Sequence, residues 1–210
     1  MNNFYFEILD KKRKSMLPII KRFKDRFYLA GGTGLALQIG HRDSIDFDFF
    51  TDQEFDPEKL LREIKKAFSN YSIEVIQSGN MTLNLIIADE VRVSFFRIKE
   101  KMLKPFMDTE YLNIASIDDI ACMKMAALLR AEFKDYVDLF YIFKQMSLNE
   151  IIDNCKEKYK DFNEMVYLKA LTSFDDINVT DILFRKGKQV KLKDIKKDFG
   201  LRVKQYLASL

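Results

Sequence analysis

The spacing of hydrophobic and polar positions along the chain changes near residue 110. Before that point two periods are mixed. Strict alternation, as in Ile45, Phe47 and Phe49 against Asp46 and Asp48, predicts strands with one polar face. Apolar residues three and four apart predict helices. The predicted helices of this part cover 4–25, 35–39 and 57–68, and the predicted strands cover 27–30, 45–50, 72–77, 82–88 and 90–97.

After residue 110 only the helical period remains. The predicted helices cover 117–131, 134–146, 148–159, 161–173 and 192–208, and Ser116, Ser147 and Asp161 stand near three of their starts. No repeat or flexible linker separates the two parts. The pattern therefore predicts an α+β protein, with a mixed α/β core over 1–110 and a helical subdomain over 111–210 that packs against it.

The composition excludes several classes of protein. With 48% hydrophobic and 32% charged residues, only seven Gly and three Pro, the 210-residue chain is not a disordered or low-complexity sequence. No apolar run is long enough to span a bilayer. The basic cluster at 11–14 is not followed by the apolar stretch of a signal peptide. Since Cys122 and Cys155 form no CxxC pair, we expect reduced thiols and a cytoplasmic protein without membrane contact.

Charge is distributed unevenly along the chain. Residues 185–204 hold nine Lys or Arg against two Asp, which is +7 for this segment and leaves −4 of the net +3 for the rest. Such a segment suits contact with a phosphate backbone or an acidic partner. It equally suits a solvated helix face around Ile195, Phe199 and Val203. Both interpretations stay open.

Two short motifs carry candidate chemistry. Asp46 and Asp48 lie two apart on one predicted strand, so both carboxylates leave the same face about 7 Å apart at Cα, a spacing that suits Mg²⁺. Upstream, Gly31-Gly32-Thr33-Gly34 joins a strand to a helix, where exposed backbone N–H groups bind phosphate. An exposed strand face and a sterically required turn are the structural alternatives. No Gly-Lys-Ser/Thr follows, so this is not a Walker A loop.

The stretch 27–51, FYLAGGTGLALQIGHRDSIDFDFFT, resembles the first motif of the AbiEii/AbiGii toxin family, a branch of the polymerase-beta-like nucleotidyltransferases. The later stretch 117–143 is similar to the third and fourth motifs of that family. The matching residues are Gly31, Gly32, Thr33, His41, Arg42, Ser44, Asp46, Asp48 and Phe50 in the first stretch, and Asp119, Lys124, Arg130, Lys134, Asp135 and Asp138 in the second.

This resemblance implies a polymerase-beta-like nucleotidyltransferase core followed by the helical subdomain that completes the active site. It implies a metal-dependent enzyme that transfers NMP from an NTP to a hydroxyl of RNA, tRNA included, or of a protein, with release of pyrophosphate. The biological role implied is that of a toxin in a bacterial toxin–antitoxin or phage-defence pair, with a cognate antitoxin as partner. Mg²⁺ or Mn²⁺ is the implied cofactor, held by Asp46 and Asp48.

The resemblance also distributes roles among the other residues. The implied catalytic residues are Asp46, Asp48, Lys124, Asp135 and Asp138, and the implied nucleotide-binding residues are Gly31, Gly32, Thr33, Arg42, Ser44 and Lys134. The residue patterns leave structural roles open for several of them. Lys134, Asp135 and Asp138 share one helix stripe and suit an ion pair, while Lys124 suits the edge of the core. Arg42 suits either a phosphate or a bond that braces Asp46.

Ser94 departs from the family pattern, which usually has a third carboxylate there on a later strand. A hydroxyl is a weaker metal ligand than a carboxylate. Asp135, Asp138, Glu74 on a neighbouring strand, or a water held by Ser94 are the candidates that compensate. The alternative function is therefore a catalytically weak or inactive protein of the same fold that binds nucleotide or a partner.

Overall fold

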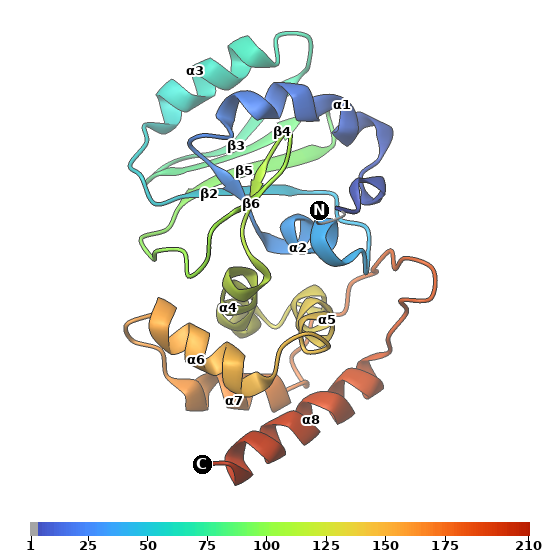
Figure 1. Ribbon diagram of the computed structural model, residues 1–210. Helices are drawn as coiled ribbons and strands as arrows, with labels where there is room; N and C mark the ends of the chain where they lie inside the picture. The colour runs from blue at the N-terminus through green and yellow to red at the C-terminus, as the bar shows by residue number, and fades with distance from the viewer. Residues whose placement is uncertain (1–3) are drawn as a thin grey trace.

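The computed structural model describes residues 4–210, and its centre is a seven-stranded mixed sheet (Figure 1). The strand order is β3-β4-β5-β2-β1-β7-β6. Strand β2 runs parallel to β5 and antiparallel to β1, so it lies in the interior of the sheet. The strands are β1 (Tyr28–Leu29), β2 (Phe47–Thr51), β3 (Ile73–Gly79), β4 (Thr82–Ile87), β5 (Val91–Arg97), β6 (Met107–Asp108) and β7 (Asn113–Ile114).

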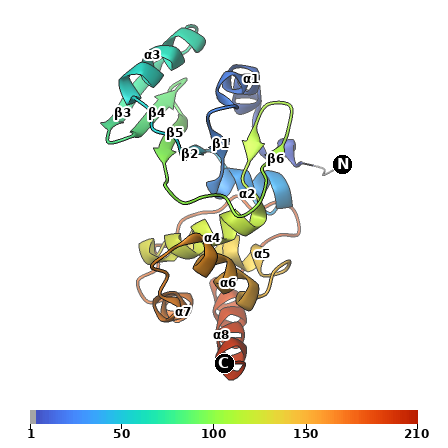
Figure 2. The same cartoon turned by 60° about the vertical axis from the view of Figure 1, so that its left-hand side comes forward.

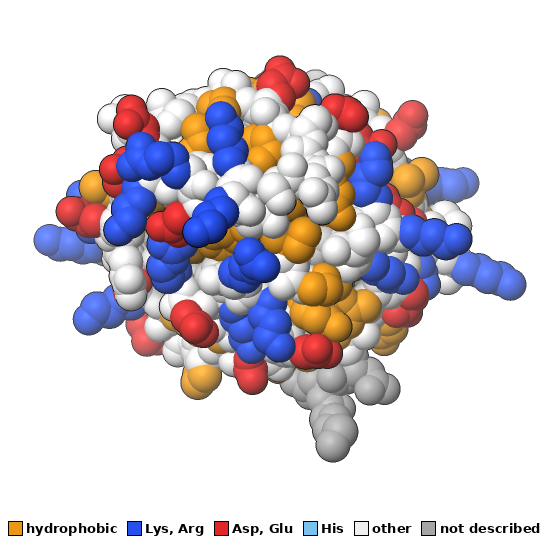
Figure 3. Space-filling view, turned by 90° about the horizontal axis from the view of Figure 1, so that it is seen from above, with side chains coloured by type: hydrophobic (Ala, Val, Ile, Leu, Met, Phe, Trp, Pro, Cys, Tyr) orange, Lys and Arg blue, Asp and Glu red, His pale blue; other side chains and the backbone are white. Residues whose placement is uncertain are grey.

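One face of the sheet is covered by α1 (Lys11–Ile20) and α3 (Pro57–Ala67), with the short turns η1 (Phe6–Ile8) and η2 (Lys21–Phe23) beside α1 (Figure 1). Asp56 caps α3 through its side chain and Pro57 occupies the first turn, as the sequence predicts. Seen from above, this side of the molecule carries many Lys and Arg side chains (Figure 3). The exposed lysines of these two helices include Lys11, Lys14, Lys59 and Lys65.

The other side of the sheet holds α2 (Gly31–Ile39) and the C-terminal helices (Figure 2). Ser116 and Ser147 cap α4 and α6 as predicted, whereas α7 begins after Asn163 rather than at Asp161. The C-terminal elements are α4 (Ile117–Ala127), η3 (Leu128–Arg130), α5 (Phe133–Ile142), α6 (Leu148–Lys158), α7 (Glu164–Thr172) and α8 (Leu192–Ala208).

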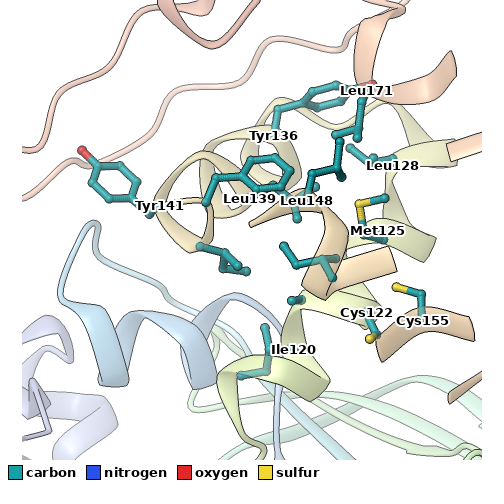
Figure 4. Packing of buried hydrophobic residues seen from close by; sticks show 14 of the residues in the cluster. Ile120, Cys122, Met125, Leu128, Tyr136, Leu139, Tyr141, Leu148, Cys155 and Leu171 are labelled. Carbon is teal, nitrogen blue, oxygen red and sulfur yellow. The ribbon is translucent and has the colours of Figure 1, made fainter. Parts of the chain in front are cut away.

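Two hydrophobic clusters hold these layers together. The first lies between the sheet and α1 with α3, and includes Phe47, Leu60 and Phe95. The second is built mainly by α4 to α8, where Cys122 and Cys155 lie among apolar side chains (Figure 4). Both cysteines are free. The domain boundary near residue 110 stays a prediction.

The α+β class and the helical C-terminal half are confirmed, and several element bounds are corrected. The predicted helix over 4–25 is broken into η1, α1 and η2. The predicted glycine turn is itself the first turn of α2, because Gly31 and Gly32 let the helix begin close to other side chains. The two-residue strands β6 and β7 are too short to show a period. Among residues 4–210, no helix has the length and apolar character of a membrane span.

Candidate active site

A cleft of about 960 Å³ opens between the sheet and the helices below it. Its floor is the face of β2 and β5 that carries Asp48 and Ser94, which are register partners, and α4 forms the opposite wall. A third wall is the segment 180–183, between α7 and α8. This segment is tied down by a 2.8 Å hydrogen bond from Asp43 N to Leu183 O. Four stretches that are distant in sequence therefore build one cleft.

Asp48 of β2 and Asp46 just before it both face this cleft, as the alternation over 45–50 predicts. Thr33 braces the segment that leads into β2, because its hydroxyl donates to the Asp46 carbonyl and lies 2.8 Å from Ser44 Oγ. Burial raises the pKa of Asp48, and the neighbouring charge of Asp46 raises it further. Two partly desolvated carboxylates that repel each other are a donor set that a divalent cation would neutralise.

The N-terminus of α2 meets the same point of the cleft. Ala30 at the N-cap position has no capping side chain, and no side chain of residues 4–210 accepts from the first turn, so these N–H groups are free to bind an anion beside Asp48. Gly31 has φ +62°, and a Cβ there would lie 2.8 Å from Asp48 Oδ2. A Cβ on Gly32 would collide with the Arg42 guanidinium. Close approach therefore requires glycine at both positions, and at Gly31 the left-handed backbone conformation requires it as well.

We expect Gly31→Ala to destabilise the protein by more than the roughly 1–2 kcal/mol that a left-handed conformation costs an L-residue. Gly187 is a matched control, since it has φ +76° but a Cβ added there would meet nothing within 4 Å. Urea unfolding of Gly31→Ala and Gly187→Ala separates the backbone cost from the contact with Asp48. Equal losses in the two variants would show that Asp48 yields freely to the added methyl group.

Asp138 is the centre of a buried charged cluster behind the cleft. Arg42 donates to both of its oxygens, from Nε at 2.7 Å and from Nη2 at 2.9 Å. His41 Nε2 lies 2.8 Å from Oδ1, and Lys124 Nζ lies 2.6 Å from Oδ2. Burial alone would raise the pKa of Asp138, but Arg42 and Lys124 hold it well below its usual value. Asp138 is thus an ionised anchor with no exposed surface.

His41 is neutral in this cluster. Burial lowers its pKa in spite of the hydrogen bond with Asp138. A neutral ring that donates from Nε2 leaves Nδ1 as an acceptor, and no residue within 4–210 donates to it. His41 therefore orients Asp138 rather than adding a charge.

Lys124 joins the buried cluster to the cleft. Its ammonium lies 2.6 Å from Asp135 Oδ1 as well as 2.6 Å from Asp138 Oδ2, and Arg130 donates to the other oxygen of Asp135 at 3.0 Å. Burial alone would lower the pKa of Lys124, but the two carboxylates raise it, so the group is charged. Lys134, by contrast, is exposed and has no ion-pair partner within the described residues. The lysine that is free to meet a new anion is therefore Lys134.

Most of the predicted site residues converge, with three corrections. Thr33 and Asp138 are buried and do not line the cleft, because they brace other residues from behind. Arg42 braces Asp138 and not Asp46, while its guanidinium still reaches the cleft. The ion pairs of Asp135 and Asp138 are with Lys124 and Arg42, not with Lys134. The predicted residues that do line the cleft are Gly31, Gly32, Arg42, Ser44, Asp46, Asp48, Lys124, Lys134 and Asp135.

Ser94 lies where the family pattern has a third carboxylate, next to Asp48 across the parallel pair of strands. Glu74 is exposed on the edge strand β3 and does not line the cleft, so it does not compensate. Within residues 4–210, no group of three or more His, Cys, Asp or Glu is arranged to hold a metal ion. Asp46 and Asp48 with the Ser94 hydroxyl nevertheless form a set of hard oxygen donors, which fits Mg²⁺ or Mn²⁺ better than a softer metal.

Several groups of the cleft wall have no signal in the sequence. The cleft is lined by segment 180–183, Glu100 and Tyr159, which come from a loop, the stretch that follows β5 and the residue that ends α6, and none of them belongs to a motif. Their position follows from tertiary packing.

Comparisons with known proteins identify the family of this chain. The family described as "Nucleotidyl transferase AbiEii toxin, Type IV TA system" matches residues 19–208. An uncharacterized protein of Aquifex aeolicus (strain VF5) is 34% identical over 157 residues, which are 71% of this chain and 74% of that protein. The family match confirms the resemblance predicted from the motifs in 27–51 and 117–143.

Solved structures share the fold at low identity. A Helicobacter pylori protein assigned as a nucleotidyltransferase has a TM-score of 0.62 and 20% identity, with 94% of this chain and 95% of that chain covered. JHP933 from Helicobacter pylori has a TM-score of 0.59 and 19% identity, with 96% and 92% covered. The antibiotic-resistance factor ANT(2'')-Ia has a TM-score of 0.53 and 11% identity, with 70% and 91% covered.

Proposed function

Because this chain belongs to the AbiEii family of nucleotidyltransferase toxins, we propose that it transfers NMP from an NTP to a hydroxyl of RNA or of a protein, with divalent metal. The observation that carries the proposal is the convergence of Asp46, Asp48 and the uncapped start of α2 in one cleft. This arrangement supports a triphosphate held between carboxylate-bound metal and backbone N–H groups. A cognate antitoxin is the proposed partner of the toxin.

Each residue then has a role that follows from its contacts. Asp46 and Asp48 would hold Mg²⁺ or Mn²⁺, which when bound neutralises phosphate charge and activates the attacking hydroxyl. Gly31 and Gly32 leave room for phosphate at the start of α2. Lys134 and the cleft side of Arg42 attract the triphosphate.

Asp135 and Asp138 hold Lys124, and the burial of Asp138 supports a positioning role for it. A general base must reach the proton that it removes. Asp138 has no exposed surface and is bonded to three donors, so it does not reach the proton of an attacking hydroxyl. The group that removes this proton must therefore face the open side of the cleft. Asp135 shares this anchoring role through its bonds to Lys124 and Arg130.

The direct test is incubation of the full chain with each α-labelled NTP, Mg²⁺ or Mn²⁺, total RNA and a protein extract. Label in RNA or protein identifies the donor and the class of acceptor together. Nucleotide binding without transfer to either acceptor under any condition would contradict the proposed reaction.

Ser94 favours a second candidate function, a nucleotide-binding protein with weak or no catalysis. One neutral hydroxyl beside Asp48 leaves the metal with less negative charge than three carboxylates would supply. Ser94→Asp tests this candidate by adding a third carboxylate beside Asp48. NMP transfer is expected to increase only if weak metal binding limits transfer in the wild type.

The basic segment 185–204 supports an RNA acceptor. In the structure α8 buries Ile195, Phe199, Val203 and Tyr206 against other helices and exposes its lysines, so residues 192–204 are a packed helix and not a loose arm. Residues 185–191 precede the helix, and Arg185 N donates to His41 O at 3.2 Å. The outer face of α8 remains available to a phosphate backbone. Helix α8 lies at the end of the molecule away from α1 and α3 (Figure 1).

We expect replacement of Lys191, Lys193, Lys197 and Lys204 by Gln to weaken RNA binding and to reduce its salt dependence, by up to about one unit of log–log slope per lysine. The matched control replaces the exposed Lys11, Lys14, Lys59 and Lys65 on the opposite side of the sheet. Filter binding at several salt concentrations measures both. An equal loss in the two variants would indicate a general charge effect and no RNA site on α8.

A further inference from the structure

The two ends of the cleft differ in chemistry. Asp48 and Ser94 are register partners on β2 and β5, and two residues farther along these parallel strands the partners are Phe50 and Phe96. The two rings lie 5.5 Å apart between centroids. The floor of the cleft is thus polar at Asp48 and Ser94 and becomes aromatic toward the C-terminal ends of β2 and β5. We call this region, lined by Phe50, Phe96, Ile98, Met123 and Tyr159, the aromatic end of the cleft.

Helix α4 supplies a wall with small side chains at this end. Met123, Ala126 and Ala127 lie three and four residues apart, and all three line the cleft. The two alanines add little bulk to this wall, so the cleft between the helix and the sheet has room for a flat group. Aromatic rings and methyl groups favour a planar, weakly hydrated ligand over phosphate.

The aromatic end also has two polar groups without partners. Neither the Tyr159 hydroxyl nor the Glu100 carboxylate takes part in a side-chain hydrogen bond or ion pair with any residue of 4–210. Both residues line the cleft, and Glu100 stands two residues after Ile98. Burial raises the pKa of Tyr159, and the Cys122 and Cys155 thiols and the Glu100 carboxylate raise it further. The neighbouring Arg97 is already bonded to Glu54, at 2.9 Å.

The position of Tyr159 is fixed by the end of α6. The adjacent Lys158 ammonium is buried, lies 2.7 Å from Asp119 Oδ1 and donates to Lys101 O at 2.9 Å. This anchor ties α6 to α4 and to the segment that follows β5. Tyr159 is therefore presented to the cleft by a rigid support, as a residue that reads a ligand must be.

We propose that the aromatic end holds the nucleobase of the donor nucleotide, and that Tyr159 and Glu100 recognise its hydrogen-bonding edge. This inference rests on the proposed function, which assigns the triphosphate to Asp46, Asp48 and the start of α2. The phenol both donates and accepts, and the carboxylate accepts only. The pair therefore favours a base that presents an amino group, and UTP is the weakest expected donor because uracil has none.

The test measures binding of ATP, CTP, GTP, UTP and inorganic tripolyphosphate by calorimetry, with Mg²⁺, to the full chain and its variants. We expect Tyr159→Phe and Glu100→Gln each to lower the affinity for the tightest NTP by about tenfold or more. Tripolyphosphate, which has no base, is expected to bind all variants alike. Ala126→Leu fills the space at the aromatic end with a good helix former, and is expected to weaken NTP but not tripolyphosphate.

Tyr71→Phe and Glu157→Gln are matched controls, since neither residue lines the cleft. Thermal unfolding of each variant confirms that it folds. The base site would be overturned, and the proposed function left intact, if all three variants bound each NTP with the affinity of the wild type and kept the same ratios of affinity among the four NTPs. The base site would also be overturned if the variants lost as much affinity for tripolyphosphate as for the NTPs. No binding of any NTP to the wild type would overturn both proposals.

Discussion

Replacing Asp46 and Asp48 together by Asn is expected to reduce NMP transfer by about a thousandfold or more, because both charged ligands of the proposed metal are lost. The loss should not come from unfolding. Burial and the charge of Asp46 raise the pKa of Asp48, so its ionised form is disfavoured in the native state, and Asn is expected to be tolerated at equal or higher thermal stability. Labelled-NTP transfer and thermal unfolding measure the two effects.

The control for this variant is Asp52→Asn, because Asp52 is exposed just after β2 and does not line the cleft. A second readout is independent of transfer. Mg²⁺ or Mn²⁺ with NTP should raise the melting temperature of the wild type and of Asp52→Asn, but not that of the double variant. Undiminished transfer by the double variant would remove Asp46 and Asp48 from the catalytic site.

Asp138→Asn is expected to destabilise the protein by about 3–5 kcal/mol, the typical cost of leaving a buried charge without its partner. Lys124 would keep its ion pair with Asp135, whereas Arg42 would lose the carboxylate with which it pairs within residues 4–210, and both cations stay buried. A loss of this size is a large part of the total stability of a domain. Urea unfolding at neutral pH measures it.

The control for this loss is a carboxylate near the surface. Asp198 pairs with Arg202 on α8 at 2.7 Å, with both side chains partly exposed, and Asp198→Asn is expected to cost less than about 1 kcal/mol. The direction in which stability changes with pH separates a charge effect from a packing effect, because a loss of packing does not depend on pH. Since the pKa of Asp138 is lowered in the folded state, its stabilisation is fully present above its unfolded pKa of about 3.9 and is lost as pH falls toward the folded value.

The difference between wild type and Asp138→Asn should therefore shrink only below about pH 4. A difference that stays constant through that range would indicate that shape, not charge, accounts for the role of Asp138. A small loss at neutral pH would mean that water enters and solvates Arg42 and Lys124.

Local patterns in the sequence determine a large part of this protein. The period of two along residues 46–49 puts Asp46, just before β2, and Asp48, within β2, on the face opposite Phe47 and Phe49, since successive extended residues point to opposite sides. The capping residues Asp56, Ser116 and Ser147 start their helices at the predicted places, because a cap acts on N–H groups two or three residues away. Such features depend only on near neighbours.

The roles of the charged residues depend on contacts between distant parts of the chain. Asp138 meets His41 and Arg42 across 97 and 96 residues, and no local period reports that encounter. The sequence alone suggests an i, i+4 ion pair between Lys134 and Asp138. In the fold, Asp138 pairs instead with the buried Arg42 and Lys124. Lys134 therefore stays exposed at the cleft.

The cleft itself has the same origin. Tyr159 reaches it because the ion pair of Lys158 with Asp119 ties the end of α6 to α4, and residues 180–183 reach it because Leu183 O accepts from Asp43 N. These contacts join residues that are far apart in the sequence. A strand period and a helix cap are properties of a few adjacent residues. A cleft wall is a property of the whole packed chain, so only the tertiary structure could bring its members together.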